Sequence, residues 1–232
     1  MAESRREVEE ALRKSFLFPL LGPDEQARFL AAAHSRSWTA GTPIVAMGEP
    51  GTSMMLVRVG NVRISRPSTE GRSIVLAELG PGAVFGEIAL LDGGPRTADV
   101  GAVTNCTLLL FERRDFMPLL EHNWRLAEAV LRMVCERLRR ADAYIADLAF
   151  SDLPARLAKT LVARSHRGPG GAVVVDDTQG ALAAMIGGSR EAVNRCLRKW
   201  EKAGLIAMNA GRIALSDPDG LAKLAGGGTG DR

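Results

Sequence analysis

The chain is poor in cysteine and has no long apolar run. Its three cysteines are odd in number and form no Cys-x-x-Cys pair, which argues against a disulfide framework and fits a reducing compartment. No run of about 18 apolar residues is present, and the charged start MAESRREVEEALRK is not followed by an apolar segment long enough for export. We therefore expect a cytoplasmic protein with no membrane partner.

The sequence also lacks the patterns of several chemical sites. An iron–sulfur cluster needs four thiolates, and the three histidines show no pattern typical of a haem ligand. There is no spacing typical of metal ligands, no nucleophile beside a base and no second cluster of carboxylates. We expect no metal and no enzymatic activity. The alternative is a nucleotide hydrolase with Glu87 as its base, and these absences count against it.

What is present resembles an ordinary globular protein. Of the 232 residues, 46% are hydrophobic and 25% are charged, with a formal net charge of +3. This length exceeds the usual single domain, so we expect two. The small net charge by itself indicates no class of partner, because its distribution matters more.

The region from about Trp38 to Phe111 consists of short apolar runs broken by glycine. Alternation in MLVRVGNVRIS, with Gly60-Asn61 at its centre, predicts a hairpin, and the close spacing of the runs predicts a small antiparallel barrel or sandwich. The segment FGEIALLDGGPRTADV, residues 85–100, interrupts the pattern. Its glycines and proline are typical of a shaped turn, in which we expect a short helix.

A heptad pattern begins at Trp124. Apolar residues recur at alternating spacings of three and four, at Trp124, Ala127, Leu131, Val134, Leu138, Ala141, Ile145 and Leu148. We call these residues the seam. A seam this regular favours a dimer interface. The alternative, a helix lying on the barrel, usually shows a broader apolar stripe.

The chain beyond the seam contains signals for a second domain. Asp152, followed by Leu153 and Pro154, has the pattern of a helix N-cap with proline in the first turn, which predicts a hinge near Phe150 and Ser151. Further on, two short helices are predicted on either side of Gly187-Gly188, and Ser189 is expected to cap the second. A hairpin with its reversal at 209–211 follows.

The second of these helices has a polar face. With Val193, Leu197 and Trp200 assigned to the core, the exposed side carries Arg190, Glu191, Asn194, Arg195, Arg198 and Lys199. Arginine matches guanine, glutamate accepts from cytosine N4, and lysine near a helix end suits phosphate. The alternative is a solvated charged face, but helix, tight turn, basic helix and β wing together predict a winged helix-turn-helix.

We predict double-stranded DNA as a partner on this basis. The expected DNA-binding residues are Thr178, Ser189, Arg190, Glu191, Asn194, Arg195 and Lys199. Lys159 and Arg212 are expected to contact phosphates.

The segment IGGSREAVNRCLRKWEKAGLI resembles the recognition-helix motif of the cyclic AMP receptor protein (CRP/FNR) family of bacterial transcription regulators, whose shared core reads S-R-E-x-V-x-R-x-L. The resemblance extends from about Phe16 to Leu215. It implies base contacts from Arg190, Glu191 and Arg195. It also implies a homodimer joined by the heptad helix, a cyclic-nucleotide-binding β-roll in the N-terminal part, and RNA polymerase as a further partner.

Within this family, FGEIALLDGGPRTADV resembles the phosphate-binding cassette. Gly86 would let the backbone approach a phosphate, and the helix after it would point free amides at the anion. Arg96 would neutralise the phosphate, Glu87 would accept from the ribose 2′-OH, and Thr97 would offer a hydroxyl. The alternative is that Glu87 and Arg96 merely pair with each other. The predicted cyclic-nucleotide-binding residues are Gly86, Glu87, Ile88, Ala89, Arg96, Thr97 and Asp142.

The identity of the base is the open point of this resemblance. Where the family presents a threonine and a serine to adenine, this chain has Ala141 and Asp142. Asp142 suits guanine N1 and N2, and a threonine after the cassette arginine is associated with cyclic GMP in eukaryotic relatives. Some bacterial relatives with hydroxyls there bind cyclic AMP. We favour cAMP as effector; cGMP, another effector, or a constitutive DNA-binding dimer with a vestigial cassette are the alternatives.

The expected fold class is α+β. It comprises an antiparallel cyclic-nucleotide-binding β-roll with N-terminal helices over residues 1–120, and a long coiled-coil dimerisation helix with a hinge over 121–150. A winged helix-turn-helix over 151–225 and a disordered tail over 226–232 complete it.

Overall fold

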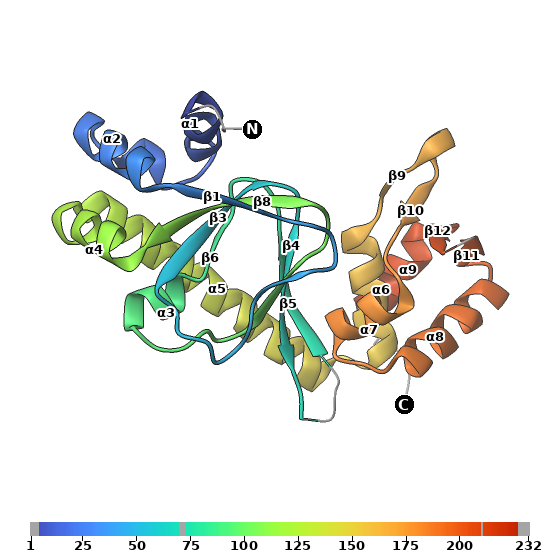
Figure 1. The fold of residues 1–232 in the computed structure, drawn as a ribbon. Helices are drawn as coiled ribbons and strands as arrows, with labels where there is room; N and C mark the ends of the chain where they lie inside the picture. Colours follow the sequence, from blue (N-terminus) through green and yellow to red (C-terminus); the bar gives the residue numbers. More distant parts are fainter. Residues whose placement is uncertain (1–4, 70–72, 210, 227–232) are drawn as a thin grey trace. The chain divides into compact units, whose positions relative to one another are not determined.

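The structure is a computed structural model that describes residues 5–69, 73–209 and 211–226 (Figure 1). The chain divides into two compact units, the first formed by 1–69 and 76–138 and the second by 70–75 and 139–232. A long helix, α5 (Trp124–Phe150), contributes to both. Strands and helices are mixed as the α+β expectation requires, so the predicted fold class is confirmed.

The first unit is a β-roll flanked by helices. Its elements are α1 (Arg5–Arg13), the short 3-10 helix η1 (Phe18–Leu20), α2 (Pro23–Ala32), β1 (His34–Trp38), β2 (Pro43–Val45), β3 (Ser53–Val59), β4 (Val62–Pro67), β5 (Ser73–Leu79), β6 (Val84–Phe85), α3 (Glu87–Asp92), β7 (Asp99–Ala102), β8 (Cys106–Glu112) and α4 (Arg113–His122). The strands form two four-stranded sheets, in the orders β1-β8-β3-β6 and β2-β7-β4-β5.

The hairpin predicted at Gly60-Asn61 is wrong. β3 pairs with β8 and β6, whereas β4 pairs with β7, so the strands on either side of this turn belong to different sheets. The turn is bound instead by the segment between β7 and β8: Thr104 Oγ1 accepts from the Asn61 amide at 2.9 Å, and the Asn61 carbonyl accepts from the Val103 amide at 2.9 Å. Alternation within each strand is the same in a hairpin and in this crossover, so it cannot tell them apart.

Aromatic packing holds the helices of the first unit onto the sheet. Phe29 of α2 stacks on Phe111 of β8 with ring centroids 4.1 Å apart. Leu126 and Val130, in the first turns of α5, are buried in the same cluster. Burial of each of these large apolar side chains stabilises the folded state by about 1.5–3 kcal/mol. One face of α5 is thereby fixed to the β-roll.

The second unit contains the predicted helix-turn-helix and wing. Its elements are α6 (Leu153–Arg164), β9 (His166–Arg167), the 3-10 helix η2 (Pro169–Gly171), β10 (Val173–Val175), α7 (Gln179–Ile186), α8 (Arg190–Lys202), β11 (Ile206–Asn209), β12 (Arg212–Leu215) and α9 (Pro218–Ala225). Asp152 caps α6, with Oδ1 accepting from the Ala155 amide at 2.8 Å. The predicted start of this helix is confirmed.

Helix α9 was not expected from the sequence. Asp217 caps it, and Leu221 is buried against the core of the unit. The tail predicted to be disordered, 226–232, lies outside the described residues except for Gly226. Across the part of the chain that the structure describes, no helix is long and apolar enough to span a bilayer.

Candidate functional site

The loop between β6 and α3 is shaped by two glycines. Gly86 has a φ of +79°, and a Cβ there would lie 2.6 Å from Arg96 Nη1 and 3.3 Å from the Ser53 carbonyl oxygen. A Cβ on Gly51 would lie 2.1 Å from the Cβ of Ala89. Backbone and side chains therefore approach more closely around the start of α3 than any other residue type would allow.

Arg96 is buried, and the hydrogen bonds that it donates to the described residues all go to neutral acceptors. Its Nη1 donates to the Ser53 carbonyl at 2.6 Å and to the Gly86 carbonyl at 3.1 Å, and its Nη2 donates to Ser53 Oγ at 3.0 Å. Burial lowers the pKa of Arg96, and the nearby Glu49, Glu112 and Glu87 carboxylates oppose that shift. The guanidinium stays charged, and an anion at this point would offset its burial.

Glu87 has one bound oxygen and one without a partner. The residue is 2% exposed, and Oε1 accepts from Arg137 Nη1 at 2.6 Å. Among the described residues, Oε2 is buried with no hydrogen-bond partner. Such an acceptor is costly unless a donor reaches it. Burial raises the pKa of Glu87, and the Arg137 guanidinium opposes this.

These contacts exclude one sequence-based alternative. Glu87 and Arg96 do not merely pair with each other, because Glu87 forms its ion pair with Arg137 and Arg96 binds Ser53 and Gly86.

Arg137 is a site residue that sequence reasoning missed. Its Nη2 also donates to the Val84 carbonyl, so it joins α5 to both β6 and α3. The available signal was a second stripe on α5, in which Leu126, Val130, Met133 and Arg137 follow one another at helical spacing.

The remaining predicted ligand residues divide between the units. Ala89 is buried in α3, where Ile88 is exposed, and Thr97 is exposed in the segment between α3 and β7. The structure therefore brings together the cassette residues and Arg137 within the first unit. Asp142 lies on the part of α5 that belongs to the second unit, and its side chain is exposed.

In the second unit, three local contacts shape the helix-turn-helix; the sequence predicts the turn at Gly187 and the cap at Ser189, but not the cap at Thr178. Thr178 Oγ1 accepts from the Ala181 amide at 3.1 Å at the start of α7. Gly187, with a φ of +64°, ends α7, and Ser189 Oγ accepts from the Ala192 amide at 3.2 Å at the start of α8. Of the polar face predicted for α8, Arg190, Glu191, Arg195, Arg198 and Lys199 are exposed and Asn194 is half-buried; Glu201 and Lys202, at the end of the helix, are exposed as well.

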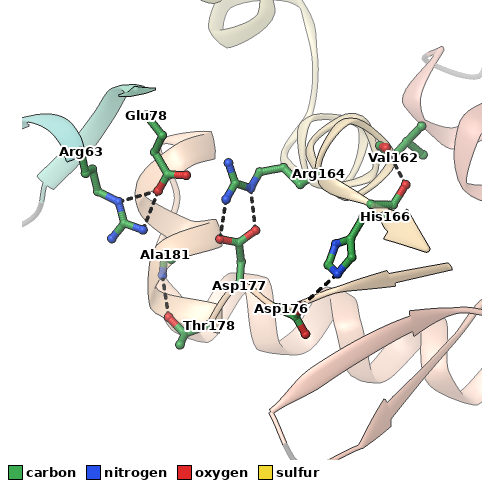
Figure 2. Close-up of polar contacts among 10 residues, drawn as sticks. Arg63, Glu78, Val162, Arg164, His166, Asp176, Asp177, Thr178 and Ala181 are labelled. Carbon is green, nitrogen blue, oxygen red and sulfur yellow. Dashed lines mark hydrogen bonds and ion pairs between the residues drawn. The ribbon is translucent and has the colours of Figure 1, made fainter. Parts of the chain in front are cut away.

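The two cations expected to contact phosphates are both engaged with carboxylates. Lys159 Nζ lies 2.6 Å from Asp147 Oδ2, and Arg212 Nε donates to Asp176 Oδ1. Asp176 also lies 3.1 Å from His166 Nε2, as Figure 2 shows. The same view draws the Arg63–Glu78 pair of the first unit.

Comparison with known proteins agrees with this division. Residues 35–123 match the cyclic nucleotide-binding domain family, and residues 155–224 match the Crp-like helix-turn-helix domain family. A CRP-like cAMP-activated global transcriptional regulator from Mycobacterium tuberculosis is 31% identical over 223 residues, which cover 94% of this chain and 100% of the relative. The chain belongs to the CRP family of transcription regulators.

Other members of the CRP family show the same extent of similarity. A cyclic AMP receptor protein from Thermus thermophilus is 32% identical over 216 residues, covering 93% of this chain and 99% of the relative. The solved structure of a CRP/FNR-family regulator from the same organism has 30% identity and a TM-score of 0.68, covering 83% of this chain and 98% of the other. This CRP-family protein therefore combines a cyclic-nucleotide-binding domain with a DNA-binding domain.

Proposed function

We propose that this CRP-family protein is a dimeric, cytoplasmic transcription regulator that binds near-palindromic DNA in response to cyclic AMP and acts with RNA polymerase. The observation that supports the effector half is a pair of buried polar groups at α3. Within the part of the chain that the structure describes, the hydrogen bonds of the Arg96 cation go to neutral acceptors, and Glu87 Oε2 has no hydrogen-bond partner. A cyclic nucleotide supplies an anion for the first and a ribose hydroxyl for the second.

Different residues of the cassette bind different parts of the nucleotide. Arg96 takes the cyclic phosphate, and Gly86 lets the amides of Ile88 and Ala89 approach the same anion. Glu87, held in place by Arg137, accepts from the ribose 2′-OH. Thr97, whose side chain is exposed, adds a hydroxyl.

Cyclic AMP is the first candidate effector, because the related regulators from Mycobacterium tuberculosis and Thermus thermophilus are named for it. Cyclic GMP is the second candidate. The observation that favours it is the exposed carboxylate of Asp142, which suits the N1 and N2 donors of guanine but not the acceptor N1 of adenine.

The dimer is supported by the exposure of the seam. Trp124, Leu131, Leu138 and Ile145 are 58–71% exposed, although they are apolar and repeat at heptad spacing. A contiguous apolar face of this kind marks an interaction site, and a second copy of the helix would cover it. The paired recognition helices would then read successive major grooves about 34–36 Å apart.

Sensing and DNA binding are proposed to couple through α5. Residues 1–120 bind the nucleotide, 121–150 dimerise and bear the hinge, and 151–225 bind DNA. A ligand shifts the two DNA-binding domains only as far as it binds the DNA-competent arrangement more tightly than the other.

Calorimetric titration with cAMP and, separately, cGMP tests the effector. We expect the full-length protein to bind one of them with micromolar or tighter affinity. Arg96→Ala should abolish this binding because the phosphate loses its cation. Arg63→Ala, which removes another half-buried arginine of the same unit, is the matched control and should bind as wild type does.

Arg96→Lys keeps the positive charge but loses the paired N–H donors of the guanidinium. This variant serves as the test if Arg96→Ala does not fold. Weakened but measurable binding is expected there. Full affinity in both Arg96 variants would refute the assigned pocket, and no binding of either nucleotide to wild type would refute a cyclic-nucleotide effector.

A further inference from the structure

Asp176 lies where two elements of the DNA-binding domain meet. β10 pairs with β12, with Val175 opposite Ile213, so Asp176 at the end of β10 and Arg212 at the start of β12 are neighbours across the sheet. Two residues later Thr178 caps α7. The first helix of a helix-turn-helix crosses the DNA backbone, and helix N-termini contact phosphates. Asp176 is therefore placed where a phosphate would pass.

The Asp176 carboxylate engages two side chains, Arg212 and His166, that a phosphate would otherwise contact. Its Oδ1 accepts from Arg212 Nε and its Oδ2 lies 3.1 Å from His166 Nε2. The hydrogen bond from Arg212 holds the pKa of Asp176 below its usual value, so the carboxylate is ionised at neutral pH. Asp176, Arg212 and His166 are each about half exposed, so a DNA phosphate can reach all three.

The neighbouring acid differs in burial. Asp177 receives two hydrogen bonds from Arg164, at 2.6 and 2.9 Å, and its side chain is 12% exposed. Figure 2 shows Asp177 facing Arg164 and Asp176 facing His166. Asp177 is thus a fixed structural partner of α6, whereas Asp176 holds Arg212 at the surface.

We propose that Asp176 is a built-in competitor of the DNA phosphate, which keeps Arg212 of the wing in an internal ion pair and so weakens binding to DNA of every sequence. The inference rests on the DNA binding stated in the proposed function. Non-specific binding is dominated by contacts between cations and phosphates. A carboxylate that occupies Arg212 removes about one such contact, while base contacts from α8 are left unchanged.

Binding of the full-length protein to a fluorescent random-sequence duplex, followed by anisotropy over a range of salt concentrations with and without cAMP, tests this. We expect Asp176→Asn to bind roughly three- to tenfold more tightly than wild type at low salt. Its plot of log affinity against log salt should be steeper by about 0.9, the value for one additional phosphate contact.

The gain should depend on Arg212. In the Arg212→Ala background, the Asp176→Asn substitution should change affinity less than about twofold, because the cation it releases is absent. Asp219→Asn on α9 removes the same charge from an exposed residue and should leave affinity within about twofold of wild type. Thermal unfolding followed by circular dichroism checks that each variant is folded.

The possible results separate the two claims. A wild-type protein that binds no duplex in either condition overturns the proposed DNA binding and this inference with it. Wild-type binding that Asp176→Asn does not strengthen overturns the inference alone. A gain of full size in the Arg212→Ala background also overturns it, because the effect would then be one of general charge.

Discussion

At the scale of single residues, Glu87 shows two opposing effects on one buried acid. Desolvation raises the pKa of this carboxyl, and the ion pair with Arg137 lowers it; burial is the larger effect, so the pKa lies above its ordinary value of 4.5. Only one oxygen is paired, which is why a single arginine does not offset the loss of water.

The raised pKa predicts a loss of stability with rising pH. Between 4.5 and the raised pKa, the folded protein still binds a proton that the unfolded chain has released, so the free energy of unfolding falls as pH rises. Glu87→Gln cannot titrate and lacks this loss. Urea denaturation of both proteins, at pH values on either side of 4.5, should show wild type becoming less stable relative to Glu87→Gln as pH increases.

Glu121→Gln, at an exposed position of the same unit, is the control and should run parallel to wild type. A wild-type stability that rises relative to Glu87→Gln with pH would mean that the Arg137 ion pair outweighs burial.

At the scale of elements, α3 is a helix of six residues whose position depends on close packing. Gly51, in the segment before β3, packs against α3. The turn after α3 is also close to Gly51, because a Cβ there would lie 3.2 Å from the Gly94 carbonyl oxygen. A short helix has little stability of its own. The cassette is therefore ordered by its neighbours.

Gly51→Ala should displace α3. The added methyl would lie 2.1 Å from the Ala89 Cβ, and overpacking of this kind costs about 1–3 kcal/mol. We expect a lower free energy of unfolding and weaker nucleotide binding by calorimetry. Gly101→Ala is the matched control, because its nearest atom would be 3.8 Å away; a loss in both variants, or in neither, would contradict the packing argument.

At the scale of the whole molecule, α5 has one face buried in its own chain and one face exposed. Leu126 and Val130 are buried in the β-roll, whereas Leu138 is 61% exposed on the seam. An apolar helix face that its own chain leaves exposed to water is typical of a surface that binds a partner. The proposed dimer accounts for both faces of one helix.

Leu138→Asp should yield a monomer, because the charge would be buried at the centre of the seam. Sedimentation analysis should give the mass of a dimer for wild type and of a monomer for this variant. Arg139→Ala, one residue further along and exposed, lies off the seam and should remain dimeric. A monomeric wild type would refute the proposed assembly.

The sequence predicted most reliably what depends on neighbours in the chain. The caps at Asp152 and Ser189 are found as expected, since a cap is a hydrogen bond over three residues. The Gly60-Asn61 hairpin failed because its alternation is also that of two strands in separate sheets. Arg137 was missed because its partner, Glu87, lies fifty positions away in the sequence.

By itself the sequence determined the starts of α6 and α8, the regular seam and the polar face of α8, because short-range hydrogen bonds and helical periodicity decide these. Only the tertiary structure decided which strands pair, which arginine forms an ion pair with Glu87, and that Asp176 forms one with Arg212. These partners lie far apart in the sequence, so only packing brings them together. Where the groups are buried, as at Glu87, an unpaired polar atom is also costly.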